Sequence, residues 1–244
     1  MADFIVFEGI DCSGKTTQIK LLYEAMRKQG FSVLLTREPF QQNIYDMCQK
    51  MLTDNSLINS HLQLLLIIND RMKHTEYIAK NFNNYDCIIS DRYYYSTLAY
   101  NCQGWSHFRD ENVMQKIQKM RLVAEIHHNF CIEPNIVFYL KTSIEEAKRR
   151  ERAAQREERA SQDEEKYNAR NACYATEEGE KWMRQISDNY DYIFDESNPL
   201  DLPGLTAYYT IREAHASQVA DEILRIMDGF WDIMRIIKDT NAQV

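Results

Sequence analysis

The 244-residue sequence contains little of what marks flexible, fibrous or membrane-spanning chains. Its 7 glycines and 4 prolines are too few for long flexible linkers or for collagen-like and low-complexity architectures. The longest apolar run, Leu64–Ile68, is far shorter than the ~20 residues that cross a bilayer. The net charge of -8 argues against a broad surface for nucleic acid. We therefore expect a globular protein with neither a nucleic-acid nor a membrane partner.

Paired cysteines are also missing, because none of the 6 cysteines belongs to a C-x-x-C motif. This argues against a zinc ribbon or a thioredoxin-type site. A disulfide framework is typical of much smaller secreted chains. The first residues, Met1–Gly9, lack the basic stretch and the long apolar run of a signal peptide. We expect a reduced, cytoplasmic compartment.

Short apolar runs alternate with helical patterns along the chain. The runs are rich in Ile, Val and Phe and show no polar alternation, as expected of parallel strands covered by helices on both faces. They are Phe4–Phe7, Val33–Leu35, Cys87–Ile89, Ile136–Leu140 and, more weakly, Tyr208–Ile211. Helices are predicted at Lys15–Gln29, Ser60–Phe82, Asp110–Asn129 and from Ala216 to Lys238. The pattern predicts a single doubly wound α/β domain over residues 1–244.

Two helical segments have features of their own. The segment 142–170 mixes charges of both signs, and Thr142-Ser143 followed by Glu145 and Glu146 forms a good helix start. Its default interpretation is a solvated helix held by i,i+4 ion pairs. The last segment, about 216–244, is predicted to be a helical extension whose apolar stripe contacts the core or a second copy. The stripe consists of Val219, Ile223, Ile226, Phe230 and Ile233.

A phosphate-binding motif follows the first predicted strand and opens the first predicted helix. It reads Gly9-Ile10-Asp11-Cys12-Ser13-Gly14-Lys15-Thr16 and matches G-x-x-x-x-G-K-[ST]. Its glycines let backbone N–H groups surround a phosphate at a helix N-terminus. Lys15 is expected to reach the β- and γ-phosphates, and the Thr16 hydroxyl to bind Mg²⁺. The motif, with Thr17 after it, predicts binding of a nucleoside triphosphate.

Charged residues follow two other predicted strands. Asp91 comes after the strand Cys87–Ile89 and is placed to hold Mg²⁺ directly or through water. Arg92 follows at once, and Arg37 ends the second strand. Because parallel strands end at the same edge of a sheet, we expect these residues to lie near the phosphate-binding loop. Two arginines at this edge predict a second phosphate site.

These motifs together resemble the thymidylate (dTMP) kinase family of P-loop nucleoside monophosphate kinases. The matching stretches occur in the family's order and extend over roughly residues 3–230. They are F-E-G-I-D-C-S-G-K-T-T-Q (Phe7–Gln18), T-R-E-P (Thr36–Pro39), N-D-R-M-K-H (Asn69–His74), S-D-R-Y-Y-Y-S-T-L-A-Y (Ser90–Tyr100) and E-P-N-I-V-F-Y-L (Glu133–Leu140).

The resemblance implies a three-layer P-loop kinase fold, with a five-stranded parallel sheet, helices on both faces and a helical lid. It implies transfer of the γ-phosphoryl group of ATP to dTMP in dTTP synthesis, with Mg²⁺, by a homodimer. On the family's pattern Arg37 and Arg92 hold the acceptor phosphate, and Asp11 and Tyr100 lie near the sugar. Arg71 contacts the thymine edge. The remaining expected acceptor residues are Ile67, Ser96 and Asn101.

The resemblance also gives the charged segment a role. Residues Ile10 to Ser13 include no basic side chain, and family members of that type supply a cation from a lid. We expect Arg152 to act with Lys15, Asp91 and Arg92 in catalysis, and Arg149 and Arg156 to bind ATP. The segment's candidate arginines are Arg149, Arg150, Arg152, Arg156 and Arg159.

Three departures from the family pattern all concern the acceptor site. Phe40 follows T-R-E-P where glycines are usual, Ile67 replaces the Phe that stacks on thymine, and the residues after Asn101 are shifted. A kinase for another pyrimidine deoxynucleotide therefore remains an alternative. A deoxynucleoside kinase, with Glu38 as base, is a second one. A GTPase-type switch would need an N-K-x-D motif, and the sequence contains none. We expect His127 with its neighbour His128 to form a surface pair, and Tyr93–Tyr95 to pack around the acceptor site.

Overall fold

The computed structural model describes residues 2–52, 57–101, 113–160, 174–195 and 206–241. Its strands are β1 (Asp3–Glu8), β2 (Val33–Arg37), β3 (Cys87–Asp91), β4 (Ile136–Lys141) and β5 (Ala207–Arg212). Its helices are α1 (Lys15–Lys28), α2 (Gln42–Leu52), α3 (Leu57–Asn81), α4 (Tyr94–Asn101), α5 (Val113–Phe130), α6 (Ile144–Ala160), α8 (Glu177–Ile193) and α9 (Ala216–Asn241).

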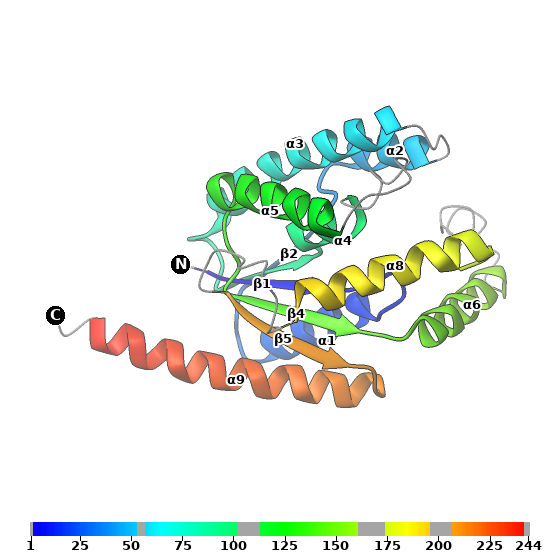
Figure 1. Ribbon diagram of the computed structural model, residues 1–244. Coiled ribbons are helices and arrows are strands. Elements are labelled where there is room, and N and C mark those ends of the chain that lie inside the picture. Colours follow the sequence, from blue (N-terminus) through cyan, green and yellow to red (C-terminus); the bar gives the residue numbers. More distant parts are fainter. Residues whose placement is uncertain (1, 53–56, 102–112, 161–173, 196–205, 242–244) are drawn as a thin grey trace.

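The five strands form one parallel sheet in the order β2-β3-β1-β4-β5 (Figure 1). All five predicted strands are present, including the weakly predicted last one, which pairs with β4 along its whole length. The central strand β1 lies between β3 and β4, so its carboxyl end lies at the middle of the edge where the parallel strands end. The phosphate-binding loop, which follows β1, therefore lies at the topological switch point, where the connections from neighbouring strands run to opposite faces of the sheet.

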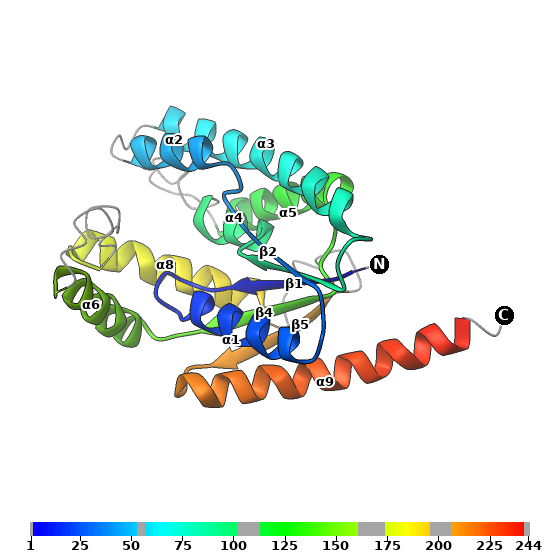
Figure 2. The ribbon, with the colours of Figure 1, turned by 180° about the vertical axis from the view of Figure 1, so that it is seen from behind.

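Alternate residues of β1 enter two separate hydrophobic cores. Phe4 and Val6 pack with α3, α4, α5 and α8, whereas Ile5 and Phe7 pack with α1 and α9. Figure 2 shows α1 and α9 side by side along the second face of the sheet. Burial on both faces explains why the strands read as continuous apolar runs. The prediction of helices on both faces of the sheet is confirmed.

The C-terminal helix is an integral part of the second core. Val219, Ile223 and Met227 are buried there against α1, and Ile226 and Phe230 are partly buried. Trp231 stacks on Phe31 with ring centroids 4.9 Å apart. The apolar stripe predicted from the sequence therefore packs mainly against the chain itself over the described part of α9.

The charged segment begins as predicted. α6 starts after Ser143, whose hydroxyl accepts a hydrogen bond from the Glu146 backbone N–H, and Glu145 and Glu146 lie in its first turn. Glu146 also pairs with Arg149 and Arg150. The remainder of this predicted segment, 161–170, lies outside the described residues.

Among the helices of the described ranges, α2, α4 and α8 were not predicted from the sequence. Helix α4 has five of its eight residues buried and the other three partly buried, and so shows no exposed polar face. Helix α8 has a recognisable start, because the Thr176 hydroxyl accepts from the Gly179 backbone N–H and acidic residues fill its first turn. Over the described ranges, no helix is long and apolar enough to cross a membrane.

Candidate active site

The loop between β1 and α1 depends on its two glycines. Gly9 and Gly14 have φ angles of 141° and 100°, which L side chains rarely adopt. A Cβ atom on Gly9 would lie 2.7 Å from the carbonyl oxygen of Leu140 in β4. The backbone can therefore follow this path only without a side chain at position 9. The curvature predicted from the motif is present.

Lys15 lies inside this curve. Its Nζ donates to the carbonyl oxygens of Gly9 and Ile10, at 2.9 and 2.8 Å, and the residue is only 7% exposed. Burial, followed by the nearby charge of Arg92, lowers the pKa of Lys15 to about 8. An anion entering the loop would offset both effects. The buried ammonium group therefore favours a phosphate at this position.

The first turn of α1 and the end of β3 together supply oxygen atoms suited to a divalent cation. Thr16 Oγ1 donates to Asp91 Oδ2 at 3.3 Å. Both residues lie beside the loop, as the motif and the strand pattern predicted. Hydroxyl and carboxylate oxygens suit Mg²⁺, which usually keeps several waters and binds through substrate phosphates. Among the described residues no cluster of three or more His, Cys, Asp or Glu could hold a metal by itself. The pair thus fits Mg²⁺ carried by a nucleotide.

Arg92 lies between the phosphate-binding loop and the sheet edge at which a second phosphate site was predicted. Its backbone adopts φ 74°, an uncommon conformation for a side-chain-bearing residue that is often seen at functional sites. Its guanidinium donates to the Gly9 carbonyl at 3.1 Å and to Asp11, and lies over the Tyr100 ring. Arg37 ends the neighbouring strand, where its side chain is exposed and donates to Gln42. Both arginines therefore lie at the predicted sheet edge.

Glu8 is a residue of this site that sequence reasoning missed. Its fully buried carboxylate accepts from the Tyr93 backbone N–H, from Ser96 and from the Tyr190 hydroxyl. Burial raises the pKa of Glu8, while the charge of Arg92 and these hydrogen bonds oppose the rise. The signal available was an acidic residue directly after an apolar strand. Glu8 thus links β1, α4 and α8 below Arg92.

Arg71 of α3 lies in a buried polar cluster. It is 1% exposed, and its guanidinium donates to the Glu38 carboxylate and to the Thr97 hydroxyl. His74 also contacts Glu38, at 2.9 Å from Nδ1 to Oε1. Although burial alone would raise the pKa of Glu38, the charge and hydrogen bonds of Arg71 and His74 lower it. A nucleobase would reach Arg71 only if neighbouring groups move.

The expectation for His127 was wrong. Its side chain is 0% exposed, and its Nε2 lies 2.8 Å from Nη1 of Arg71. His128, the next residue on α5, is on the surface and contacts Glu133, as expected. A local sequence pattern cannot show that α5 packs one histidine against a cation on α3. The neighbouring tyrosines Tyr93–Tyr95 are buried, which agrees with the predicted packing role.

The remaining predicted acceptor residues lie on α3 and α4. The Asn101 side chain donates to Gln63 at 3.3 Å, which places the two helices in contact there. Ile67 is half-buried on α3. Ser96 lies under the Arg92 guanidinium, from which it accepts at 3.1 Å. The shifted residues after Asn101 lie outside the described ranges.

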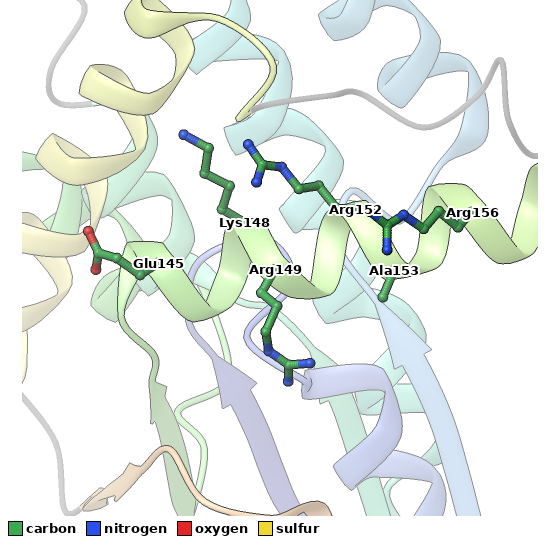
Figure 3. Close-up of a pocket in the computed structure, with 6 residues that line it drawn as sticks. All are labelled: Glu145, Lys148, Arg149, Arg152, Ala153 and Arg156. Carbon is green, nitrogen blue, oxygen red and sulfur yellow. The ribbon is translucent and has the colours of Figure 1, made fainter.

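The lid arginines divide into two groups. Arg150 Nη1 donates to the backbone carbonyl of Ser13 at 2.8 Å and so joins α6 to the phosphate-binding loop. Arg149, Arg152 and Arg156 line a cavity of about 510 Å³ together with Lys148. Figure 3 shows Arg149 leaving α6 on the opposite side from Lys148 and Arg152. The side chain of Arg159 is outside the described part of the structure.

Comparison with known proteins agrees with this geometry. The family model described as thymidylate kinase matches residues 7–193. A probable thymidylate kinase of Sulfurisphaera tokodaii is 34% identical over 152 residues, which cover 62% of this chain and 70% of that protein. The thymidylate kinase of Prochlorococcus marinus is 32% identical over 233 residues, covering 92% of this chain and 97% of that protein.

A solved structure supports the same fold. The crystal structure of thymidylate kinase from Ehrlichia chaffeensis aligns with a TM-score of 0.59 and 22% identity, covering 93% of this chain and 98% of that one. At this identity the likeness concerns the fold alone. The family match over most of the chain, together with the full-length relative, gives the classification: this chain belongs to the thymidylate kinase family.

Proposed function

We propose that this protein is a dTMP kinase, which transfers the γ-phosphoryl group of ATP to dTMP and forms dTDP and ADP. The observation that carries this conclusion is the position of Asp91 and Arg92 beside the phosphate-binding loop in a chain of this family. One edge of the sheet thereby presents a triphosphate site and cations for a second phosphate. A nucleoside kinase acts on a neutral hydroxyl acceptor, which would bring no second phosphate for Arg37 and Arg92 to bind.

The ATP side of the site is formed by the loop residues Gly9 to Thr17. Backbone N–H groups at the start of α1 would surround the phosphates, and the Lys15 ammonium would neutralise them. Mg²⁺ held near Thr16 and Asp91 would supply further charge neutralisation. Arg150 would keep the loop's outer carbonyl groups turned toward α6 and away from the anion, because it already donates to the Ser13 carbonyl oxygen.

The acceptor side is formed around Arg92. Arg37 and Arg92 would hold the dTMP phosphate in line with the γ-phosphate of ATP. Asp11 and Tyr100, both partners of the Arg92 guanidinium, would lie beside the sugar, with Ser96 beneath them. The acceptor is already an anion, so the reaction needs no strong general base. Catalysis then consists of positioning and charge neutralisation.

The base of the acceptor would lie between α3 and α4. Ile67 would pack on the ring without the stacking energy of an aromatic residue, about 1 kcal/mol weaker. Arg71 and Asn101 would face the polar edge of thymine. The buried Arg71 guanidinium would reach the base once the groups that cover it have moved.

The lid would complete the site after ATP binds. Arg152 would act on the transferred phosphoryl group, and Arg149 and Arg156 would bind the nucleotide phosphates, because all three line one cationic cavity. A cation supplied in this way can raise a phosphoryl-transfer rate by orders of magnitude.

The proposed enzyme is a homodimer. Exposed apolar side chains occur on α3 and α5, which lie across the sheet from α1 and α9 (Figure 1). They are Leu62, Leu65, Leu122 and Phe130. A second copy packed on this face would remove them from water. Analytical ultracentrifugation of the wild type and of a Leu65→Glu variant would test this assembly.

The test of the activity is ADP release from Mg²⁺–ATP across dTMP, dUMP, dCMP, dGMP, dAMP, UMP and thymidine. The Lys15→Ala variant serves as the blank, and Lys20→Ala, an exposed lysine of the same helix, as the matched control. We expect turnover to be strongest with dTMP in the wild type and in the control. Preference for another monophosphate would contradict the thymine assignment, and turnover with thymidine would contradict the acceptor class.

A further inference from the structure

The Arg71 guanidinium is held from three directions. Its Nε and Nη2 donate to Glu38, its Nη2 donates to Thr97 Oγ1 at 2.7 Å, and its Nη1 lies 2.8 Å from His127 Nε2. A guanidinium has five N–H donors. Nη1 also lies 3.3 Å from His127 Nδ1, so among the described residues both hydrogen-bond contacts of Nη1 are made with the His127 ring.

The chemistry of the pair fixes the tautomer of His127. An arginine can only donate, so the His127 nitrogen nearest to Arg71, Nε2, must accept. The ring is neutral, because burial and then the charge of Arg71 lower the pKa of His127 to about 2. The proton of the neutral ring therefore resides on Nδ1, which lies 3.8 Å from the sulfur of Cys131. His127 thus presents a lone pair to Arg71 at all ordinary pH values.

On the opposite side of the guanidinium, Glu38 has further partners of its own. Glu38 is held by His74, whose other ring nitrogen contacts Thr36 Oγ1 at 2.8 Å. The Phe40 ring stacks on His74 with centroids 4.9 Å apart. Phe40 is itself held through its backbone N–H by the Asp70 carboxylate. Phe40, the residue that follows T-R-E-P, therefore packs against the same cluster through His74.

We propose that His127 is a positioning residue for acceptor specificity, which holds the Nη1 side of the Arg71 guanidinium in the orientation that meets the base. This inference rests on the proposed function. An arginine N–H can pair with the 4-carbonyl oxygen of thymine or uracil. It cannot pair with the 4-amino group of cytosine, which is itself a donor. Without His127, the Nη1 group would lose its acceptor and the guanidinium could turn in its cavity.

The experiment compares three variants of the full chain. His127→Phe keeps a ring but removes the acceptor, His127→Gln keeps an acceptor oxygen, and His128→Phe is the matched surface control. For His127→Phe we expect the KM for dTMP to rise about tenfold or more, which is the scale of one buried hydrogen bond to a charged group. We expect the kcat/KM preference for dTMP over dCMP to fall by a similar factor, with the KM for ATP unchanged. His127→Gln should restore most of the wild-type KM for dTMP and most of the preference for dTMP over dCMP.

Other outcomes would overturn the inference. Folded His127→Phe with the wild-type KM for dTMP and the wild-type preference would exclude the positioning role. An equal rise of both substrates' KM values would show a general structural effect instead. A wild type that turns over no dTMP would overturn the proposed function itself.

A measurement on the wild type keeps the inference testable if His127→Phe does not fold. Two-dimensional ¹H–¹⁵N NMR of the imidazole groups should show His127 as the Nδ1–H tautomer, without titration between about pH 5.5 and 8.5. A protonated Nε2 would contradict the geometry on which the inference depends.

Discussion

The buried pair between Glu38 and Arg71 gives the sharpest prediction for stability. The two side chains are 6% and 1% exposed, and Glu38 also binds His74. Glu38→Gln preserves the shape of the side chain but removes its charge, which leaves the Arg71 cation uncompensated. Breaking a buried pair from one side costs about 3–5 kcal/mol. In a chain of this size each kcal/mol lowers the Tm by about 2–4 °C, so we expect a decrease of about 6–20 °C.

Differential scanning calorimetry at neutral pH would measure this effect. The control is Glu76→Gln, which removes an exposed ion pair with Lys80 and should change the Tm by less than about 2 °C. A double variant, Glu38→Gln with Arg71→Met, should recover part of the loss, because it removes the uncompensated cation. A Glu38→Gln protein that melts with the wild type would refute the reasoning.

The pH dependence provides a second test of the same pair. The pKa of Glu38 is lower in the folded protein than its usual value, despite burial, because of Arg71 and His74. The stability that this carboxylate contributes is therefore present above the unfolded pKa of about 4.3, and is lost as the pH falls through the folded value. The difference in Tm between the wild type and Glu38→Gln should shrink as the pH falls below about 4.

Three further predictions concern the phosphate-binding loop. The pKa of Lys15 is about 8 in the folded protein and 10.5 ordinarily, so between pH 8 and 10.5 only the unfolded chain keeps the Lys15 proton. The free energy of unfolding of the wild type, measured by urea titration, should therefore rise with pH over this range relative to that of Lys15→Met. Gly9→Ala should abolish ATP binding in calorimetric titrations, because its Cβ would lie 2.7 Å from the Leu140 carbonyl oxygen, whereas Gly229→Ala, with open space around it, should bind normally. Arg150→Ala should raise the KM for ATP about tenfold and leave that for dTMP unchanged, because the Ser13 carbonyl loses a charged donor.

Much of the fold follows from local sequence patterns. Strands buried on both faces are continuously apolar, and the helix Lys15–Lys28 is followed after its C-cap by Gly30, whose φ of 91° suits that position. The phosphate-binding motif also determines its own geometry, because its glycines and lysine act over eight consecutive residues. These features were predictable since each depends on neighbours in the sequence.

Features that depend on distant partners were not predictable in the same way. Helix α4 is too short and too completely buried to show a helical period. His127 and Arg71 are 56 residues apart in sequence, and only the packing of α5 on α3 brings them together. A histidine on a helix therefore looked like a surface residue. The role of Glu8 required the contact with Tyr190, which lies 182 residues away.

The most direct test of the proposed function is to follow the γ-phosphoryl group itself. The wild type would be incubated with Mg²⁺, dTMP and ATP labelled with ³²P at the γ-position, and the products separated by thin-layer chromatography. We expect the label to appear in dTDP, in an amount equal to the ADP formed. Label released only as inorganic phosphate, with or without dTMP, would contradict the account.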